Sequence, residues 1–380
     1  MKVYLDNATT TKVDGSVLDS MSEYLREEYG APTTEYGHSW GVAALEAIQA
    51  SRETIAGSVG AEPDEVIFTS GGVESTNMAI QGVALRSGGG KIITTGIEHS
   101  SILKTIKHLE KLGFSGEYLG VDGKGFLDPD ELDAAIDDET ILVTVGHGNG
   151  EIGTVQDVGR IAEICQSRDV ALHLDARSSY LWEKLDLKEV KADLVSLTGH
   201  TIHGPKGIGV LVKRKGIKID PILHGPGTEL NERPGTINVP GAVGMARAVE
   251  VWDEGDVGEV RARRDRLWES IRDAAPDTDL TGPAENRLVN NLSCNFRYIE
   301  GESILLYLDM AGIAVSTGSA CSSKSLKPSY VLSAIGIPPE ESHGSIRFSL
   351  SRYNSDEEID YACEKVTEVV KRLKSMSSMR

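Results

Sequence analysis

The most informative segment of this chain reads Asp193-Leu-Val-Ser-Leu-Thr-Gly-His-Thr-Ile-His-Gly-Pro-Lys-Gly-Ile-Gly-Val-Leu-Val212. Its apolar ends and its Gly/Pro-rich middle predict a short buried strand, a polar turn, a loop and a second strand. Around this segment, from about residue 66 to 260, short apolar runs alternate with amphipathic helical patterns. The alternation predicts an α/β fold with a mainly parallel sheet covered by helices on both faces.

The predicted elements can be placed by residue number. Strands are expected at 66–68, 91–94, 141–145, 171–175 and 209–212, and helices at 130–136 and 158–167. The charged stretch 256–265 is expected to begin a long helix that connects two domains. We therefore predict a large domain over residues 16–260 and a smaller α+β domain formed by residues 1–15 and 261–380.

Composition narrows the classes of partner. The net charge of −19 argues against nucleic acid or an anionic membrane as a main partner, since both bind basic surfaces. No apolar run approaches the ~20 residues that span a bilayer, and residues 1–10 carry no apolar signal core. We expect a cytoplasmic protein.

The four cysteines, Cys165, Cys294, Cys321 and Cys363, lie far apart and show no C-x-x-C spacing. That spacing excludes a local zinc knuckle and indicates no disulfide framework. Cys165 lies among apolar residues of one predicted helical face, and Cys294 lies in an alternating, strand-like run, so both are expected to pack in a core. Cys321 alone lies in a loop of small, polar and basic residues.

Further motifs extend over nearly the full length, from Tyr4-Leu-Asp-Asn-Ala-Thr-Thr10 to Ile346-Arg-Phe-Ser-Leu350. Together with the segment 193–212 they resemble cysteine desulfurases of the NifS/IscS type, a class-V aminotransferase family that uses pyridoxal 5′-phosphate (PLP). The resemblance implies the PLP-dependent transferase fold type I, with a seven-stranded large-domain sheet. It also implies a homodimer in which each cofactor site lies near the subunit interface.

One position departs from that family at its central covalent group. Thr201 follows Gly199-His200, where the family carries the lysine that holds PLP as a Schiff base. A hydroxyl group cannot form an imine. Lys206 belongs to the ordinary loop pattern of the family, and we do not interpret it as a relocated nucleophile.

The resemblance implies a cofactor site in which Asp175 pairs with the pyridinium nitrogen of PLP and His99 stacks on the ring and takes part in catalysis. Each of the two has a simpler interpretation, because a strand-end aspartate often caps a helix and a lone histidine is often a packing residue. The other residues implied to contact the cofactor are Gly71, Gly72 and Val73 at a Gly-rich turn, Asn149, Thr198, His200 and Thr201, with Thr236 supplied by the partner subunit.

Three substitutions lie where PLP would sit. Val73 replaces a threonine that donates to the phosphate, Ser178 replaces a glutamine, and Gly150 replaces an asparagine. The surrounding scaffold matches the family well. We interpret this contrast as a site relieved of its cofactor task, so PLP is expected to be bound noncovalently or to be absent.

The part of the family that handles sulfur is retained. Ser316-Thr-Gly-Ser-Ala-Cys-Ser-Ser-Lys-Ser-Leu-Lys-Pro-Ser-Tyr330 resembles the loop whose cysteine attacks the substrate sulfur and carries a persulfide, here Cys321. The neighbouring lysines favour the thiolate. Arg347 matches the arginine that binds the substrate carboxylate, with a domain-interface salt bridge as the alternative.

Three functions from different classes follow. The first is an active desulfurase that releases sulfur from L-cysteine with noncovalent PLP. The second is a partner in iron–sulfur assembly, in which Cys321 relays sulfur or ligates a nascent [2Fe–2S] cluster shared with a U-type scaffold, with sulfide as a sulfur source. The third uses His99, His147, His200 and His203 as metal or acid–base groups. The pattern of retained and lost residues favours the second.

Overall fold

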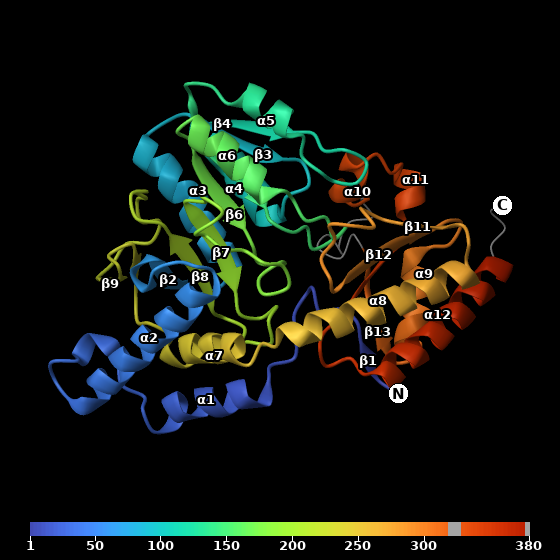
Figure 1. The fold of residues 1–380 in the computed structure, drawn as a ribbon, viewed down its shortest axis with the longest axis horizontal. Helices are drawn as coiled ribbons and strands as arrows, with labels where there is room; N and C mark the ends of the chain where they lie inside the picture. The colour runs from blue at the N-terminus through green and yellow to red at the C-terminus, as the bar shows by residue number, and fades with distance from the viewer. Residues whose placement is uncertain (318–327, 377–380) are drawn as a thin grey trace.

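Seven strands form the central sheet of this computed structural model, which describes residues 1–317 and 328–376 (Figure 1). Their order is β2-β8-β7-β6-β5-β3-β4, and β8 alone runs in the direction opposite to the other strands. The strands are β2 (Val66–Thr69), β3 (Lys91–Thr95), β4 (Ser115–Leu119), β5 (Thr140–Gly146), β6 (Ala171–Asp175), β7 (Leu194–Thr198) and β8 (Gly209–Lys213). The predicted α/β fold with a mainly parallel sheet is confirmed.

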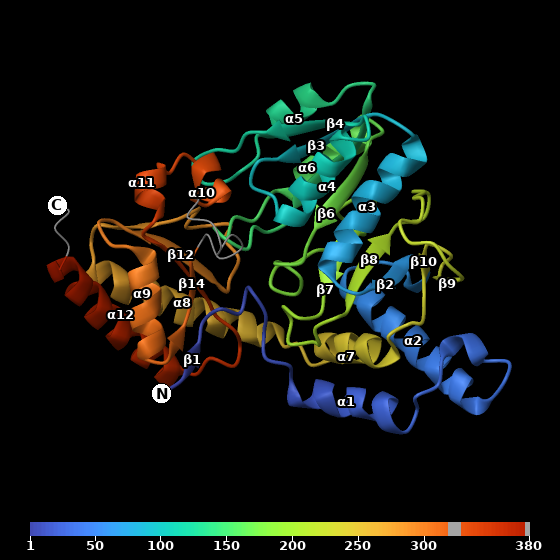
Figure 2. The ribbon, with the colours of Figure 1, turned by 180° about the vertical axis from the view of Figure 1, so that it is seen from behind.

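Helices cover both faces of this sheet, as the strand sequences require. Within β5, Leu142 joins the apolar cluster beneath α3 (Gly72–Ser87) and α4 (Ser100–Glu110), whereas Val143 and Val145 join the cluster on the opposite face. Figure 2 shows α3 crossing in front of the sheet. The opposite face is covered by α2 (Ser39–Ser58), α6 (Val158–Ser167) and α7 (Val239–Glu250), with α1 (Gly15–Arg26) packed on α7 and α5 (Pro129–Ala135) on α6.

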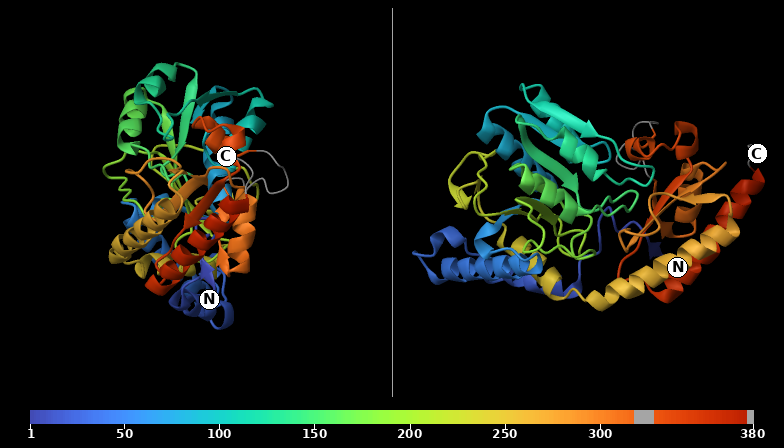
Figure 3. Two further views of the ribbon diagram at one scale, coloured as in Figure 1. Left: turned by 90° about the vertical axis from the view of Figure 1, so that its right-hand side faces the viewer. Right: turned by 45° about the horizontal axis from the view of Figure 1, so that its top comes forward.

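A smaller unit is built on a second, antiparallel sheet in the order β11-β12-β15-β14. These strands are β11 (Thr278–Leu280), β12 (Asn291–Phe296), β14 (Ser316–Thr317) and β15 (Ser345–Ser349). The long helix expected from the charged stretch is α8 (Glu254–Ala274), which packs along α12 (Asp356–Met376) in Figure 3. The remaining helices of this unit are α9 (Gly301–Met310), α10 (Tyr330–Ala334) and α11 (Pro339–Ser342).

The first residues of the chain belong to the smaller unit. β1 (Val3–Tyr4) pairs in parallel with β13 (Ile313–Ala314), and Leu5 is fully buried in the same apolar core as Phe296 and Phe348. The short elements not yet mentioned are the 3-10 turns at Pro32–Thr34 and Pro63–Glu65 and the hairpin of β9 (Gly227–Glu229) and β10 (Arg233–Pro234). The chain therefore begins in the smaller unit and enters the large unit before α1.

Three of the four cysteines fall within the described residues. Cys165 on α6 and Cys294 on β12 are buried, as expected, and burial raises the pKa of the Cys165 thiol to about 12. Cys363 on α12 is partly buried. Cys321, together with Lys324 and Lys327, lies outside the described residues. Among the helices of the described ranges, none has the length and apolar character that a membrane crossing requires.

Candidate functional site

Four strands of the large sheet bring polar residues to one edge. β6 ends at Asp175, β5 at Gly146 and β7 at Thr198, while His99 lies just after β3 and caps the N-terminus of α4. Parallel strands of an open α/β sheet present their carboxyl ends at a common edge, which is where such folds bind ligands. A cavity of about 260 Å³ lies there, between the large sheet and the smaller unit.

Most of the residues implied by the family resemblance line this cavity. They are His99, Asn149, Asp175, Thr198, His200, Thr201 and Arg347. Gly71, Gly72 and Val73 lie at the start of α3 and are not part of its described lining, and Thr236 is exposed in the loop after β10. The strand-end and loop residues that the resemblance implies thus lie together at this sheet edge within a single subunit, whereas the Gly-rich turn and Thr236 lie outside the cavity lining.

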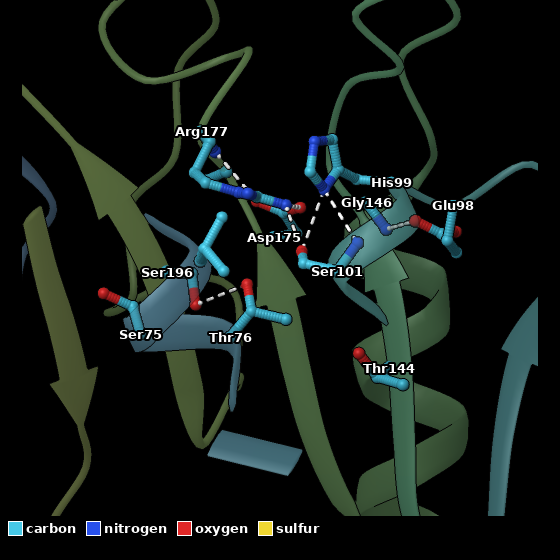
Figure 4. A network of polar contacts seen from close by, with 12 residues as sticks. Ser75, Thr76, Glu98, His99, Ser101, Thr144, Gly146, Asp175, Arg177 and Ser196 are labelled. Carbon is cyan, nitrogen blue, oxygen red and sulfur yellow. Dashed lines mark hydrogen bonds and ion pairs between the residues drawn. The ribbon is translucent and has the colours of Figure 1, made fainter. Parts of the chain in front are cut away.

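An arginine that follows β6 holds the strand-end carboxylate (Figure 4). Arg177 Nε donates to Asp175 Oδ1 at 2.7 Å, its Nη2 pairs with Asp175 Oδ2, and its backbone N–H donates to Oδ1 at 3.2 Å. The exposed fractions of the two side chains are 11% and 8%, so this is a buried ion pair. Burial alone would raise the pKa of Asp175, but the charge and hydrogen bonds of Arg177 lower it to about 2.

The same guanidinium group continues the network to His99. Arg177 Nη2 donates to Ser101 Oγ at 3.1 Å, and Ser101 Oγ lies 2.8 Å from His99 Nδ1. His99 Nδ1 also accepts the backbone N–H of Ser101 at 3.0 Å, which places the ring proton on Nε2. Burial and the Arg177 charge lower the pKa of His99 to about 4, so the imidazole is neutral at physiological pH.

The aliphatic part of Arg177 lies against the Gly-rich turn that opens α3. A Cβ atom built on Gly72 would lie 1.7 Å from Arg177 Cδ and 2.6 Å from Cγ. Only glycine at position 72 leaves room for this contact. The Arg177 stem therefore covers the Gly72 end of the helix whose free N–H groups would face an anion.

Two threonines face the cavity with different hydrogen bonding. Thr201 Oγ1 donates to the backbone carbonyl oxygen of Arg177 at 2.9 Å, and Thr201 is 8% exposed. Thr198 Oγ1 is buried and has no hydrogen-bond partner among the described residues. The hydroxyl at position 201 is thus committed to holding the Arg177 segment in place.

Two carboxyl groups, the buried Glu98 and the half-buried Glu151, border the cavity and were not singled out from the sequence. Glu98 accepts hydrogen bonds from Thr95 Oγ1 at 2.7 Å and from the Gly146 N–H at 2.8 Å, and burial still raises its pKa to about 8. Burial likewise raises the pKa of Glu151 to about 7, although Ser329 Oγ donates to it. Both groups hold a proton over part of the physiological pH range.

Arg347, expected to bind a substrate carboxylate, has an intramolecular partner. Its Nη2 donates to Asp6 Oδ1 and to Thr9 Oγ1, each at 2.9 Å, and its Nη1 donates to the Gly150 carbonyl at 3.2 Å. Its Nε is buried and without a partner among the described residues. The salt bridge to Asp6 joins β15 to the N-terminal segment within the smaller unit, and the hydrogen bond to the Gly150 carbonyl reaches the large one.

Asn149 is occupied by the loop that carries it. Its Nδ2 donates to the Ile97 carbonyl at 2.9 Å, and its Oδ1 accepts the N–H groups of Glu151 and Ile152 at 2.9 and 3.0 Å. His200 is half-buried, and burial and the Lys206 charge lower its pKa. Both side chains border the cavity, but Asn149 has its amide groups satisfied within the protein.

The histidines proposed as metal ligands do not converge. His147 Nδ1 is 2.9 Å from Ser179 Oγ, and His203 Nδ1 is 2.8 Å from the Lys12 carbonyl oxygen. Burial lowers the pKa of each ring to about 4. Within residues 1–317 and 328–376, no three His, Cys, Asp or Glu side chains are grouped so that they could hold a metal ion.

The residues present do not fit a bound PLP molecule. The carboxylate of Asp175, which would meet the pyridinium nitrogen, already has the guanidinium of Arg177 as its cation. The same side chain overlies Gly72, and Thr201 offers a hydroxyl group that already donates to the Arg177 carbonyl. Three features therefore disagree with bound PLP: the position of the Arg177 stem, the charge already paired with Asp175, and the hydroxyl group at position 201.

Arg177 is a further site residue that the sequence interpretation missed. The signal was present, because a charged residue two positions after a strand-end aspartate is within reach of its carboxylate. Within Asp175-Ala-Arg-Ser178, the family resemblance pointed to Asp175 and Ser178 and not to Arg177. Ser101, which connects Arg177 to His99, was missed in the same way.

Comparisons with known proteins agree with the fold. A family model described as aminotransferase class-V matches residues 3–362. Proteins named cysteine desulfurase IscS are similar: that of Dictyoglomus turgidum is 44% identical over 99% of this chain and 96% of its own, and that of Methanosarcina thermophila is 45% identical over 99% and 94%. A solved structure titled NifS-like protein has a TM-score of 0.91 at 35% identity and covers 98% of this chain and 100% of its own.

Proposed function

Because this chain belongs to the class-V aminotransferase family, among cysteine desulfurases of the NifS/IscS type, we propose a role in iron–sulfur assembly and sulfur transfer without PLP-dependent desulfuration. The family is PLP-dependent. In this member, Cys321 would relay sulfur or ligate a nascent cluster. The cytoplasmic location expected from the sequence is part of this proposal, since it would keep the Cys321 thiol reduced.

The observation that carries the proposal is the buried ion pair between Asp175 and Arg177. A PLP-dependent enzyme of this family needs that carboxylate for the cofactor ring, and it needs a lysine where Thr201 stands. Loss of general acid–base catalysis by lysine would by itself cost about 10²–10⁴ in rate. The Arg347–Asp6 pair adds support, since an arginine held by a carboxylate is less available to a substrate carboxylate.

The role of Cys321 follows from its sequence context, since the residue lies outside the described residues. A thiolate is the usual ligand of iron in such clusters, and one thiolate needs further ligands from a partner. Free sulfide enters a cluster at its own oxidation level, whereas persulfide formation from sulfide requires a two-electron oxidant. Of the two roles, ligation of a nascent [2Fe–2S] cluster therefore needs fewer co-reactants when sulfide is the source.

The partners proposed are a second copy of this chain and a U-type scaffold protein. The acidic surface, with a net charge of −19, favours a basic or neutral docking face on such a partner. The scaffold would supply the other cluster ligands, and the desulfurase-like chain would supply Cys321.

The first experiment records the absorption spectrum of the anaerobically purified protein before and after addition of PLP. No PLP band and no release of alanine and sulfide from L-cysteine are expected. A PLP band that shifts with L-cysteine, with turnover that disappears in Cys321→Ala, would replace this proposal with an active desulfurase that uses noncovalent PLP.

The second experiment reconstitutes the mixture of this protein and a U-type scaffold with ferrous iron and sulfide under anaerobic conditions. Cluster content should fall in Cys321→Ala and stay unchanged in Cys363→Ala, a partly buried thiol on α12 that serves as the control. A stable complex whose cluster content is the same in the wild type and in Cys321→Ala would contradict the ligand role and would leave docking as the only activity.

A further inference from the structure

One residue, Arg177, contacts three separate features of the candidate cofactor site. Its guanidinium group pairs with Asp175, its aliphatic stem lies over Gly72, and its backbone carbonyl accepts the hydroxyl of Thr201. These features are the pyridinium partner, the phosphate end and the Schiff-base position that the family resemblance implies. A single residue therefore occupies or engages all three.

We propose that Arg177 is the residue that determines cofactor exclusion, because it supplies Asp175 with an internal cation and covers the Gly72 end of α3. The proposal rests on the proposed function in that the wild-type protein does not take up PLP. It goes further by naming the cause. Restoring a lysine at position 201 does not restore the cofactor site while Arg177 remains.

The side chain is held where it is by several contacts at once. The carboxylate accepts two side-chain hydrogen bonds from the guanidinium group, and Ser101 accepts a third. Arg177 remains charged at any physiological pH, since burial is outweighed by Asp175 and its pKa is raised. Turning the side chain out to solvent would leave Asp175 buried without a counter-charge.

If Arg177 is the cause of cofactor exclusion, removing its side chain should restore PLP binding. In Arg177→Ala the carboxylate of Asp175 is left without a cation and the turn at Gly72 is uncovered. A pyridinium ring offers the missing positive charge at that carboxylate. The truncated protein is therefore expected to take up PLP, and the cofactor should stabilise it.

The test compares the wild type with Arg177→Ala, Thr201→Lys and the double variant. PLP uptake is measured by equilibrium dialysis, and the thermal midpoint is recorded with and without PLP. Borohydride reduction followed by peptide mass analysis then reports a covalent adduct at position 201. None of these readouts depends on catalytic turnover.

Arg177→Ala should bind PLP at least tenfold more tightly than the wild type, and PLP should raise its thermal midpoint. Thr201→Lys alone should give no trapped adduct, whereas the double variant should give one. The matched control is Arg168→Ala, which removes an exposed arginine whose Nε donates to Asp133 at 2.8 Å. It should behave as the wild type.

A second variant guards against misfolding. Asp175→Asn combined with Arg177→Ala leaves no unpaired charge at the site, and it should still take up more PLP than the wild type because the stem over Gly72 is gone. It should bind less tightly than Arg177→Ala, since an amide cannot pair with a pyridinium charge.

The outcomes separate this inference from the proposed function. PLP uptake by the wild type as tight as that of Arg177→Ala would overturn both. Folded Arg177 variants that take up no more PLP than the wild type would overturn this inference alone. An adduct trapped in Thr201→Lys with Arg177 intact would also overturn it, because the arginine would then be no barrier.

Discussion

The buried pair of Asp175 and Arg177 should show a large coupling energy in a double-mutant cycle. Arg177→Met keeps much of the stem but removes the charge, and Asp175→Asn removes the opposite charge. With exposed fractions of 11% and 8%, each single change leaves an uncompensated or unsatisfied buried group. Breaking one side of such a pair costs about 3–5 kcal/mol, whereas removing both sides is often close to neutral.

The pH dependence of the unfolding free energy gives an independent magnitude for the contribution of Asp175. The folded pKa of Asp175 is lowered to about 2, below its ordinary value of about 3.9. A depressed acidic pKa contributes stability that is present above about pH 4 and is lost as the pH falls toward 2, here on the order of 2–3 kcal/mol. This contribution is smaller than the cost of a single substitution, because a single substitution also leaves the other charged group buried without a partner at neutral pH.

The assay is urea unfolding of the wild type, the two single variants and the double variant at pH 7, repeated at intervals down to pH 3. Each single variant should unfold at a lower urea concentration, and the double variant should lose less than the sum of the two. In the variants that lack Arg177 or Asp175, the acid-side loss assigned to this pair should disappear. Additive losses at pH 7, within about 0.5 kcal/mol, would refute the pairing as an energetic unit.

Three further predictions concern neighbours of this pair. Because burial raises the pKa of Glu98 to about 8, its neutral form contributes stability that is fully present below about pH 4 and is lost as the pH rises toward 8. Glu98→Gln should therefore remove a fall of up to about 1.4 kcal/mol per pH unit from the urea profile between about pH 5 and 8, and an unchanged slope would contradict the assignment. Thr201→Val should cost about 1 kcal/mol by leaving the Arg177 carbonyl without its donor, whereas Thr198→Val, which loses no partner among the described residues, should cost nothing measurable in the same thermal scan. Gly72→Ala places a Cβ atom 1.7 Å from Arg177 Cδ and should lower stability by about 1–3 kcal/mol. The same substitution in an Arg177→Ala background should be tolerated, and an equal loss in both backgrounds would argue against the contact.

Local sequence patterns predicted the elements of the large sheet well. Residues 171–175 and 209–212 were expected as strands and form β6 and β8, because apolar runs of four or five residues bounded by turns can bury both faces of a sheet. The carboxyl-edge position of Asp175 follows from the same strand. These features depend on periodicity over a few neighbouring residues.

The partners of the site residues could not be predicted in that way. The Arg347–Asp6 pair joins residues 341 positions apart, and no local pattern encodes such a contact. Arg177 is close to Asp175 in sequence, but the direction of its side chain is set by Gly72 and Ser101 on other elements. Likewise the raised pKa of Glu98 reflects burial that only the packed fold creates.

The parallel pairing of β1 with β13 has a consequence for how this chain folds during synthesis. Residues 3 and 4 find their strand partners at 313 and 314, and Asp6 bridges to Ser349. Residues 3 and 4 therefore leave the ribosome long before their partners, while the large sheet between them can form from contacts closer in sequence. β1 therefore pairs late, and a chain arrested before residue 313 would present a folded large sheet with β1 still unpaired.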